Sequence, residues 1–120
     1  MTNDRMNDRH TYYYEGDISD LQLAMKMFRF GFRTLGGLEV MSVIDHGKAS
    51  DGKFTTDTIE YRLDGGSTVV IMMHKAEPKL EVSISVADND RESAAAEEER
   101  IRADLENIIQ MDNRMGYCCE

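Results

Sequence analysis

The amino-acid sequence predicts an α+β protein, a two-layer sandwich in which a four-stranded, mainly antiparallel sheet carries two helices on one face. Three observations predict this class. Apolar residues recur at helical spacing near both ends of the chain, residues between these stretches alternate at every second place, and the turns are rich in glycine. With 120 residues, the chain has the length of one domain. The expected order is helix, four strands, helix.

The first helix is expected to begin near Ser19, because Ser19 and Gln22 have the spacing of a capping box. Its apolar stripe comprises Leu21, Met25, Phe28 and Phe32. The Gly36-Gly37 pair is expected to end it. Residues 1–11 are polar, with Asn-Asp-Arg occurring twice, which predicts a disordered leader.

Four strands are expected between the helices. Residues 38–44 are short and rich in β-formers, whereas residues 45–54 contain two glycines and many polar groups, which indicates a surface loop. Residues 56–63 alternate, with Ile59, Tyr61 and Leu63 on one face, and a glycine-rich hairpin turn leads to residues 68–73. The clearest alternation is that of the last strand, where one face carries Leu80, Val82, Ile84 and Val86.

The third expected strand, residues 68–73, is apolar on both faces. Val70 and Met72 are expected either to lie in a central strand or to form a surface for a protein partner or a second copy of the chain. For Met72 both interpretations stay open. Other methionines are expected to fill the core, namely Met25, Met27, Met41 and Met73.

The second helix is expected to run from Asn89 or Asp90 to about Gln110, with Asn89 and Glu92 at capping-box spacing. Its buried stripe comprises Ile101, Leu105, Ile108 and Ile109. The spacing of Glu98 and Arg102 predicts an ion pair along the helix. The acidic run of residues 97–99 indicates a solvated face.

The composition excludes several classes of partner. A net charge of -9 and a pI of about 4.7 repel nucleic acid and anionic lipid. No apolar run reaches the roughly 18 residues of a membrane span, and the N-terminus lacks the apolar core of a secretory signal. A cytoplasmic protein with no membrane or nucleic-acid partner is therefore expected. Residues 12–111 are expected to form one domain, followed by a flexible tail, residues 112–120.

The adjacent Cys118 and Cys119 cannot cross-link distant parts of a fold, which fits a reduced compartment. Two exposed thiols in the tail are expected. A vicinal disulfide or half of a metal site is the alternative.

Several short segments follow one another in a recognisable order. They are "MKMFR" at residues 25–29, Gly36-Gly37, a strand ending in Asp45, "IEYRLDGGSTVVI" and the turn Glu77-Pro78-Lys79. In these features the chain, from about Tyr12 onward, resembles the C-terminal, fourth domain of the α-D-phosphohexomutase superfamily, in its bacterial phosphoglucomutase and phosphopentomutase branch. The resemblance implies a TATA-binding-protein-like fold and a link to carbohydrate metabolism.

In that family the turn closes a motif Arg-Pro-Ser-Gly-Thr-Glu-Pro-Lys, whose Arg, Ser and Thr hold the phosphate of the substrate. Alignment on Glu77-Pro78-Lys79 places Met72, His74 and Ala76 at those three positions, and Lys75 at the glycine. The resemblance therefore implies a degenerate phosphate-binding loop that comprises His74, Lys75, Ala76 and Lys79. The nucleophile and Mg²⁺ site of such mutases lie on other domains, so no catalytic residue, metal or cofactor is expected.

The resemblance thus implies a stand-alone, degenerate phosphoglucomutase or phosphomannomutase C-terminal-like domain that acts as a non-catalytic binding or regulatory module. The alternative is a residual sugar-phosphate-binding domain, or a fragment of a phosphoglucomutase, in which His74, Lys75 and Lys79 hold a small anion. A third hypothesis is an enzyme that uses Asp45-His46 with His74 or Asp51, because His and carboxylate groups build metal and acid–base sites.

Overall fold

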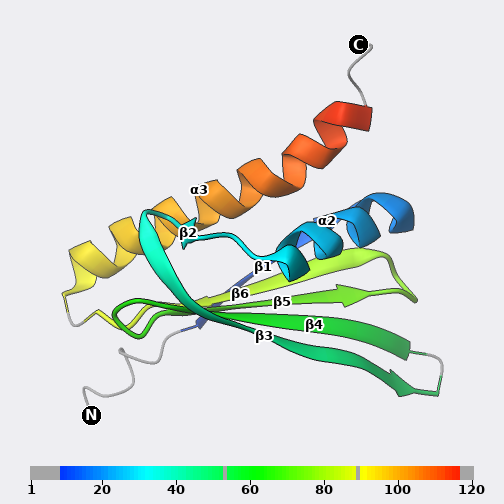
Figure 1. The fold of residues 1–120 in the computed structure, drawn as a ribbon, viewed down its shortest axis with the longest axis horizontal. Helices are drawn as coiled ribbons and strands as arrows, with labels where there is room; N and C mark the ends of the chain where they lie inside the picture. Colours follow the sequence, from blue (N-terminus) through cyan, green and yellow to red (C-terminus); the bar gives the residue numbers. More distant parts are fainter. Residues whose placement is uncertain (1–8, 53, 89, 117–120) are drawn as a thin grey trace.

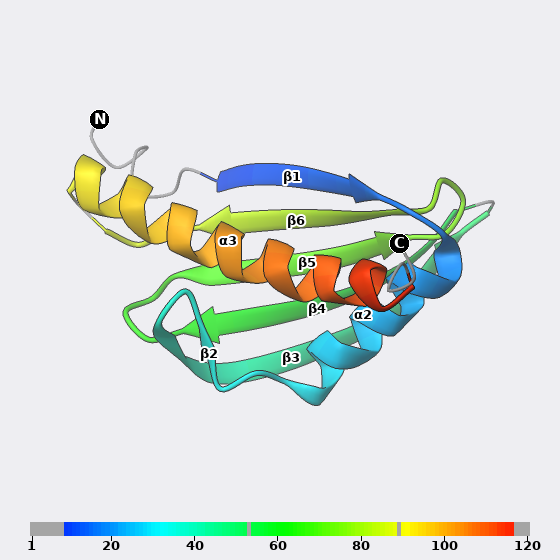
Figure 2. The same ribbon diagram turned by 90° about the horizontal axis from the view of Figure 1, so that it is seen from above.

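The computed structural model of the chain describes residues 9–52, 54–88 and 90–116 as an α+β fold with two helices and a six-stranded antiparallel sheet (Figure 1). In chain order the elements are β1 (Arg9–Glu15), α2 (Ile18–Phe30), β2 (Thr34–Leu35), β3 (Leu38–Asp51), β4 (Phe54–Leu63), β5 (Thr68–His74), β6 (Lys79–Ser85) and α3 (Arg91–Gly116). The strand order across the sheet is β1-β6-β5-β4-β3-β2. The sheet curls, and both helices lie on one of its faces (Figures 1 and 2).

The sheet has six strands and not the four expected, because β1 and β2 also belong to it. Strand β1 includes residues 9–11 of the expected leader, and residues 1–8 lie outside the described part of the chain. Tyr12 and Tyr14 pack against the core, opposite Val82 and Leu80 of β6. Three consecutive tyrosines thus form part of an edge strand, in which Tyr12 and Tyr14 face the core and Tyr13 is exposed. Such a strand needs burial on one face and only one neighbouring strand.

The surface loop expected at residues 45–54 is a hairpin arm instead. Strand β3 continues to Asp51, and β4 begins at Phe54. The β3–β4 ladder has register shifts between Val40 and Ser42 and between Asp45 and Gly47, where Gly47 has a φ of 77°. The arm is polar because most of its residues are exposed. Of its two glycines, Gly47 belongs to a bulge and Gly52 to the turn between β3 and β4.

Helix α2 begins at Ile18, and Asp17, not Ser19, is the N-cap residue. The helix ends before the expected Gly36-Gly37 pair, because Gly31 adopts a φ of 95° and its N–H donates to the carbonyl of Met27. The expected stripe is buried within the helix at Leu21, Met25 and Phe28. Phe32 lies beyond the helix end but packs edge-on against Phe28, with ring centroids 5.8 Å apart.

Helix α3 runs to Gly116, past the expected end at Gln110 and into the expected tail, since no glycine or proline interrupts it earlier. Its N-terminus is capped by Asp90, whose Oδ2 accepts the N–H of Ser93 at 3.0 Å. The predicted capping box includes Asn89, which lies outside the described residues, as do Cys118 and Cys119.

The core lies between the helices and the concave face of the sheet (Figure 1). The predicted alternations and the stripe of the second helix are confirmed, since the following residues are all buried: Ile59, Tyr61, Leu63, Leu80, Val82, Ile84, Val86, Ile101, Leu105, Ile108 and Ile109. Met25 and Met73 are buried and Met27 is half-buried, whereas Met41 is 60 % exposed beside the first β3 bulge. The prediction that Met41 fills the core is therefore wrong.

Among the described residues, neither helix combines the length and the apolar character that a membrane span requires.

Candidate functional site

The expected phosphate-binding loop is the turn between β5 and β6, but its cations do not converge. His74, on the face of β5 opposite the helices, has its Nε2 2.9 Å from the Glu81 carboxylate. Lys79 has its Nζ 3.9 Å from Glu77 and 5.1 Å from the ring centroid of Tyr13. A pocket of about 210 Å³ does contain His74, Ala76 and Lys79, but the carboxylates of Glu81 and Glu77 already lie beside His74 and Lys79.

Lys75 points to a different place. It lines a pocket of about 200 Å³ beside α2, which we call the cationic pocket and whose lining comprises Gln22, Met25, Lys26, Arg29, Lys48, Asp57, Met73 and Lys75. The backbone N–H of Lys75 donates to the carbonyl of Thr55 at 3.1 Å, which fixes the start of the turn. The structure thus separates Lys75 from His74 and Lys79, although all four predicted loop residues lie within one turn of the chain.

Three elements bring the cationic side chains together. Gln22, Met25, Lys26 and Arg29 lie at helical spacing along one side of α2. Lys48 follows the second bulge of β3 and lies opposite Asp57 in the β3–β4 ladder. Lys75 directly follows β5. The bulge therefore matters, because it sets which residues of the β3 arm face the helices.

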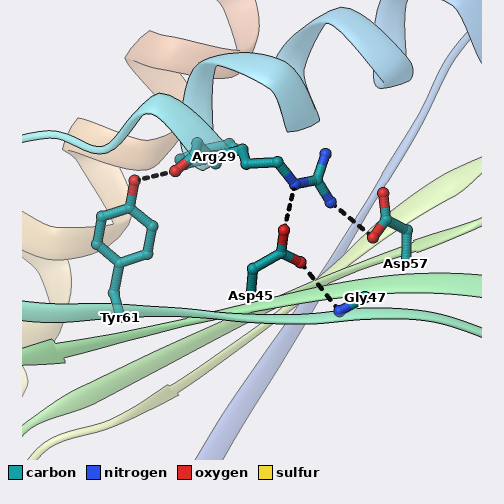
Figure 3. Close-up of polar contacts among 6 residues, drawn as sticks. Arg29, Asp45, Gly47, Asp57 and Tyr61 are labelled. Atoms are coloured by element: carbon teal, nitrogen blue, oxygen red, sulfur yellow. Dashed lines mark hydrogen bonds and ion pairs between the residues drawn. The ribbon is translucent and has the colours of Figure 1, made fainter.

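Arg29 is held by two carboxylates (Figure 3). Its Nε donates to Asp45 Oδ2 at 2.8 Å, and its terminal nitrogen donates to Asp57 Oδ1 at 2.7 Å. The N–H of Gly47 donates to the other oxygen of Asp45 at 2.9 Å. Because the Asp57 side chain is only 4 % exposed, Arg29 compensates the charge of a buried carboxylate.

These hydrogen bonds favour the charged forms of Asp45 and Arg29. The hydrogen bond from Arg29, and then that from the Gly47 N–H, hold the pKa of Asp45 below its usual value. The same bonds to Asp45 and Asp57 raise the pKa of Arg29. Arg29 is thus held as a structural cation, and among the described residues neither of its carboxylates forms an ion pair with a lysine.

The three pocket lysines, Lys26, Lys48 and Lys75, differ from Arg29 in one respect. The ion pairs within the described residues include none of them. Asp57, the cross-strand neighbour of Lys48, binds Arg29 instead. Like charges that share a small pocket repel one another, and a bound anion relieves that repulsion. The pocket therefore concentrates positive charge that no carboxylate among the described residues pairs with.

Tyr61 fixes the end of α2 from which Arg29 projects. Its hydroxyl donates to the backbone carbonyl of Phe28, next to Arg29 (Figure 3). Burial raises the pKa of Tyr61 to about 12. The ring of Tyr61 thus packs in the core, and its hydroxyl holds the end of α2 beside the pocket.

A second polar cluster attaches β1 to α3. Glu98 contacts His10 Nδ1 and accepts the hydroxyl of Tyr12, and Tyr14 donates to Glu106 at 2.6 Å. Burial and the Glu98 contact raise the pKa of Tyr12 to about 12. This cluster borders a pocket of about 370 Å³, whose lining contains both arginines and carboxylates: Arg91, Arg102, Asp88, Glu98 and Glu99.

The cluster corrects two expectations about α3. Arg102 lies nearer to Glu99 and Glu106, at 3.7 and 3.9 Å, and its guanidinium lies 5.0 Å from the ring centroid of Tyr12. The predicted Glu98–Arg102 pair is replaced because Glu98 binds β1. The acidic run is also only partly solvated, since Glu97 accepts the hydroxyl of Ser67 at 2.6 Å.

The residues of the hypothetical enzyme site lie apart. Asp45 binds Arg29, His46 lies 2.9 Å from Glu60, and His74 lies near Glu81. In the described part of the chain, no three His, Cys, Asp or Glu side chains are placed to hold a metal ion.

Val70 and Met72 are half-buried on the face of the sheet opposite the helices. Each has polar or charged neighbours on both adjacent strands: Val70 lies opposite Ser83 and Glu60, and Met72 opposite Glu81 and Thr58. They form a narrow apolar stripe in a polar face.

No family model, curated protein or solved structure matches this chain. The relationship to phosphohexomutases therefore stays a prediction.

Proposed function

We propose that this chain is a non-catalytic binding module whose cationic pocket takes a small phosphate-bearing anion, such as a sugar phosphate. One observation carries the proposal: Lys26, Lys48 and Lys75 converge on a pocket of about 200 Å³ without an ion pair among the described residues. The chain as a whole carries a net charge of -9, so this concentration of cations is a local exception.

The size and walls of the pocket define the class of ligand. Drug-sized ligands occupy pockets of about 300–1,000 Å³, so this smaller pocket fits one phosphate group with the rest of the molecule in solvent. Lysine ammonium groups bind phosphate as point charges, without the directional fork of arginine. The side chains of Met25 and Met73 add apolar walls, and Gln22 adds an amide donor. We therefore expect a charge-dependent site that discriminates weakly among sugar phosphates.

Binding without catalysis follows from the same contacts. Both Asp45 and Asp57 accept hydrogen bonds from Arg29. Neither is therefore a free general base beside the lysines. The pocket offers charge for binding, and the one carboxylate in its lining, Asp57, serves to hold Arg29.

We also propose that the fold is TATA-binding-protein-like and that the chain derives from a phosphohexomutase C-terminal domain that works in the cytoplasm, in carbohydrate metabolism. Two features support this proposal. Helix α2, strands β3 to β6 and helix α3 follow the expected order, and Glu77-Pro78-Lys79 lies at the turn between β5 and β6. On this account the ancestral loop lost its phosphate clamp, and Lys75 now contributes to a neighbouring pocket.

Isothermal titration calorimetry with glucose 6-phosphate tests the function, with glucose 1-phosphate, inorganic phosphate and uncharged glucose alongside. Lys48→Gln and Lys75→Gln are expected to weaken binding about fivefold each, since one charge contact contributes about 1 kcal/mol. Lys79→Gln is the matched control, because Lys79 belongs to the same turn but lies outside the cationic pocket. It is expected to bind as the wild type does.

Two results would reject the proposal. One is the absence of binding at millimolar phosphate ester. The other is an equal loss of affinity in Lys79→Gln, which would indicate that the anion binds at the turn between β5 and β6 and not in the cationic pocket.

A further inference from the structure

The sheet has an open edge at β1. This strand pairs with β6 on one side, and among the described residues no strand pairs with its other side (Figure 2). Its seven residues, from Arg9 to Glu15, pair with β6 without a register shift. The outer edge is therefore a regular row of backbone N–H and carbonyl groups, which is a template for another strand.

The opposite edge of the sheet is protected. Strand β2 pairs only with Leu38 and Glu39, so most of β3 is also unpaired on its outer side. However, β3 carries two bulges and the charged side chains of Asp45 and Lys48. Bulges and charges on an edge strand hinder pairing with another chain. Strand β1 has no bulge, so it is the edge that remains competent to pair.

The sequence of β1 is self-complementary in charge. In an antiparallel pair of identical strands about a two-fold axis, one residue lies on the axis and faces its own copy. An axis at Tyr12 is the one that pairs all seven residues of β1. It places Arg9 of each copy opposite Glu15 of the other.

The charged pairs lie on an accessible face. Because Tyr12 and Tyr14 face α3, Arg9, Tyr13 and Glu15 lie on the face opposite the helices. The ion pairs within the described residues include neither Arg9 nor Glu15. Both charges are therefore free to pair across a two-fold axis.

We propose that a second copy of this chain pairs with β1, antiparallel about a two-fold axis at Tyr12. The axis is perpendicular to the sheet, so the helices of both copies stay on one face. Figure 2 shows β1 at the outer margin of the described sheet, with the rest of the sheet on one side of it only. The two sheets join into one, with two Arg9–Glu15 pairs across the junction. The interface needs the edge strand and not the stripe formed by Val70 and Met72.

Charge-reversal variants of β1 test the proposal. Sedimentation velocity measures dimer formation at protein concentrations from micromolar to millimolar. The wild type is expected to form dimers as its concentration rises, and added salt weakens them. Arg9→Glu and Glu15→Arg each place like charges opposite one another and are expected to weaken the dimer at least about tenfold. The double variant, R9E with E15R, restores both pairs and is expected to dimerise as the wild type does.

Met72→Lys is the matched control, because Met72 lies on the same face, two strands from the edge. It is expected to leave the dimer unchanged. Circular dichroism checks that each variant keeps its fold, which is expected since both charged positions are exposed. A wild type that stays monomeric at millimolar concentration overturns the proposal. So does a double variant as weak as the single ones, or a dimer that Met72→Lys dissociates.

Discussion

Arg29 is the residue on which the geometry of the pocket depends. It joins Asp45, at 46 % side-chain exposure, to Asp57, at 4 %, so one guanidinium links a surface carboxylate to a buried one. Its own side chain is 37 % exposed, so solvent screens part of each attraction. The arrangement orients the guanidinium and leaves the lysines as the free cations of the site.

Asp57→Asn separates the structural role of this carboxylate from its electrostatic effect on the pocket. We expect a loss of about 1–2 kcal/mol in the free energy of unfolding, because Arg29 loses a charged partner. We also expect tighter anion binding, because a negative charge leaves the pocket lining. Urea denaturation and calorimetric titration measure the two effects. Weaker anion binding in a folded variant would contradict the account.

The pH dependence of stability tests the contact of Asp45. Its pKa is lowered in the folded protein, by Arg29 first and by the Gly47 N–H second. The folded state thus favours the charged carboxylate, and the stabilisation is present above the unfolded-state pKa of about 3.9. It is lost as the pH falls through the lower pKa of the folded state. Urea midpoints of the wild type and Asp45→Asn should differ at neutral pH and converge in acid. A difference that grows in acid would reverse the sign and refute this assignment.

At the scale of elements, the turn between β2 and β3 packs closely against α3. Gly36 has a φ of 59°, and its N–H donates to Asp104 of α3 at 2.8 Å. A Cβ at Gly36 would lie 2.7 Å from Cγ1 and 2.8 Å from the backbone nitrogen of Ile101. The glycine therefore permits both the turn and the close approach of the helix.

Gly36→Ala is expected to lower the free energy of unfolding by about 3 kcal/mol, from overpacking against α3 and backbone strain together. Gly37→Ala is the matched control, because Gly37 has a φ of 81° but no atom within 4 Å of its Cβ position. It is expected to cost about 1 kcal/mol, from strain alone. Urea denaturation measures both changes. Equal losses would show that the contact with Ile101 contributes nothing.

The sequence predicts best the elements whose pattern repeats. The last strand and the stripe of the second helix were predictable, because each alternation or helical spacing continues through several buried residues. Strand β1 was not, because its two inward tyrosines lie among charged residues and Glu98 and Glu106 of α3 satisfy their hydroxyls. The end of α2 was not predictable either, because Gly31, five residues before the Gly36-Gly37 pair, already has a positive φ.

The cationic pocket could not be predicted for a related reason. Lys48 lies in a segment whose composition predicts a loop, and only the β3 bulge decides which face of the sheet its side chain joins. Lys26 and Arg29 showed helical spacing, but nothing in the sequence indicates that Lys75 meets them. The resemblance to phosphohexomutases groups Lys75 with His74 and Lys79 in one loop. In the structure Lys75 lines the cationic pocket, whereas His74 and Lys79 lie near Glu81 and Glu77.

The whole molecule sets a small cationic site within a strongly acidic chain. A net charge of -9 repels anions at long range, and salt screens this repulsion as well as the local attraction. Short-range contacts with the lysines must therefore dominate any binding. The same acidic surface opposes self-association, which is why the two proposed Arg9–Glu15 pairs are needed at the β1 edge.

The most direct measurement is a titration of isotope-labelled protein with glucose 6-phosphate, followed through the backbone amide resonances. The account predicts saturable shifts at Lys26, Lys48 and Lys75 and little change at His74 and Lys79. That result would place the anion in the cationic pocket. No saturable shift at millimolar ligand, or shifts confined to His74 and Lys79, would contradict the account.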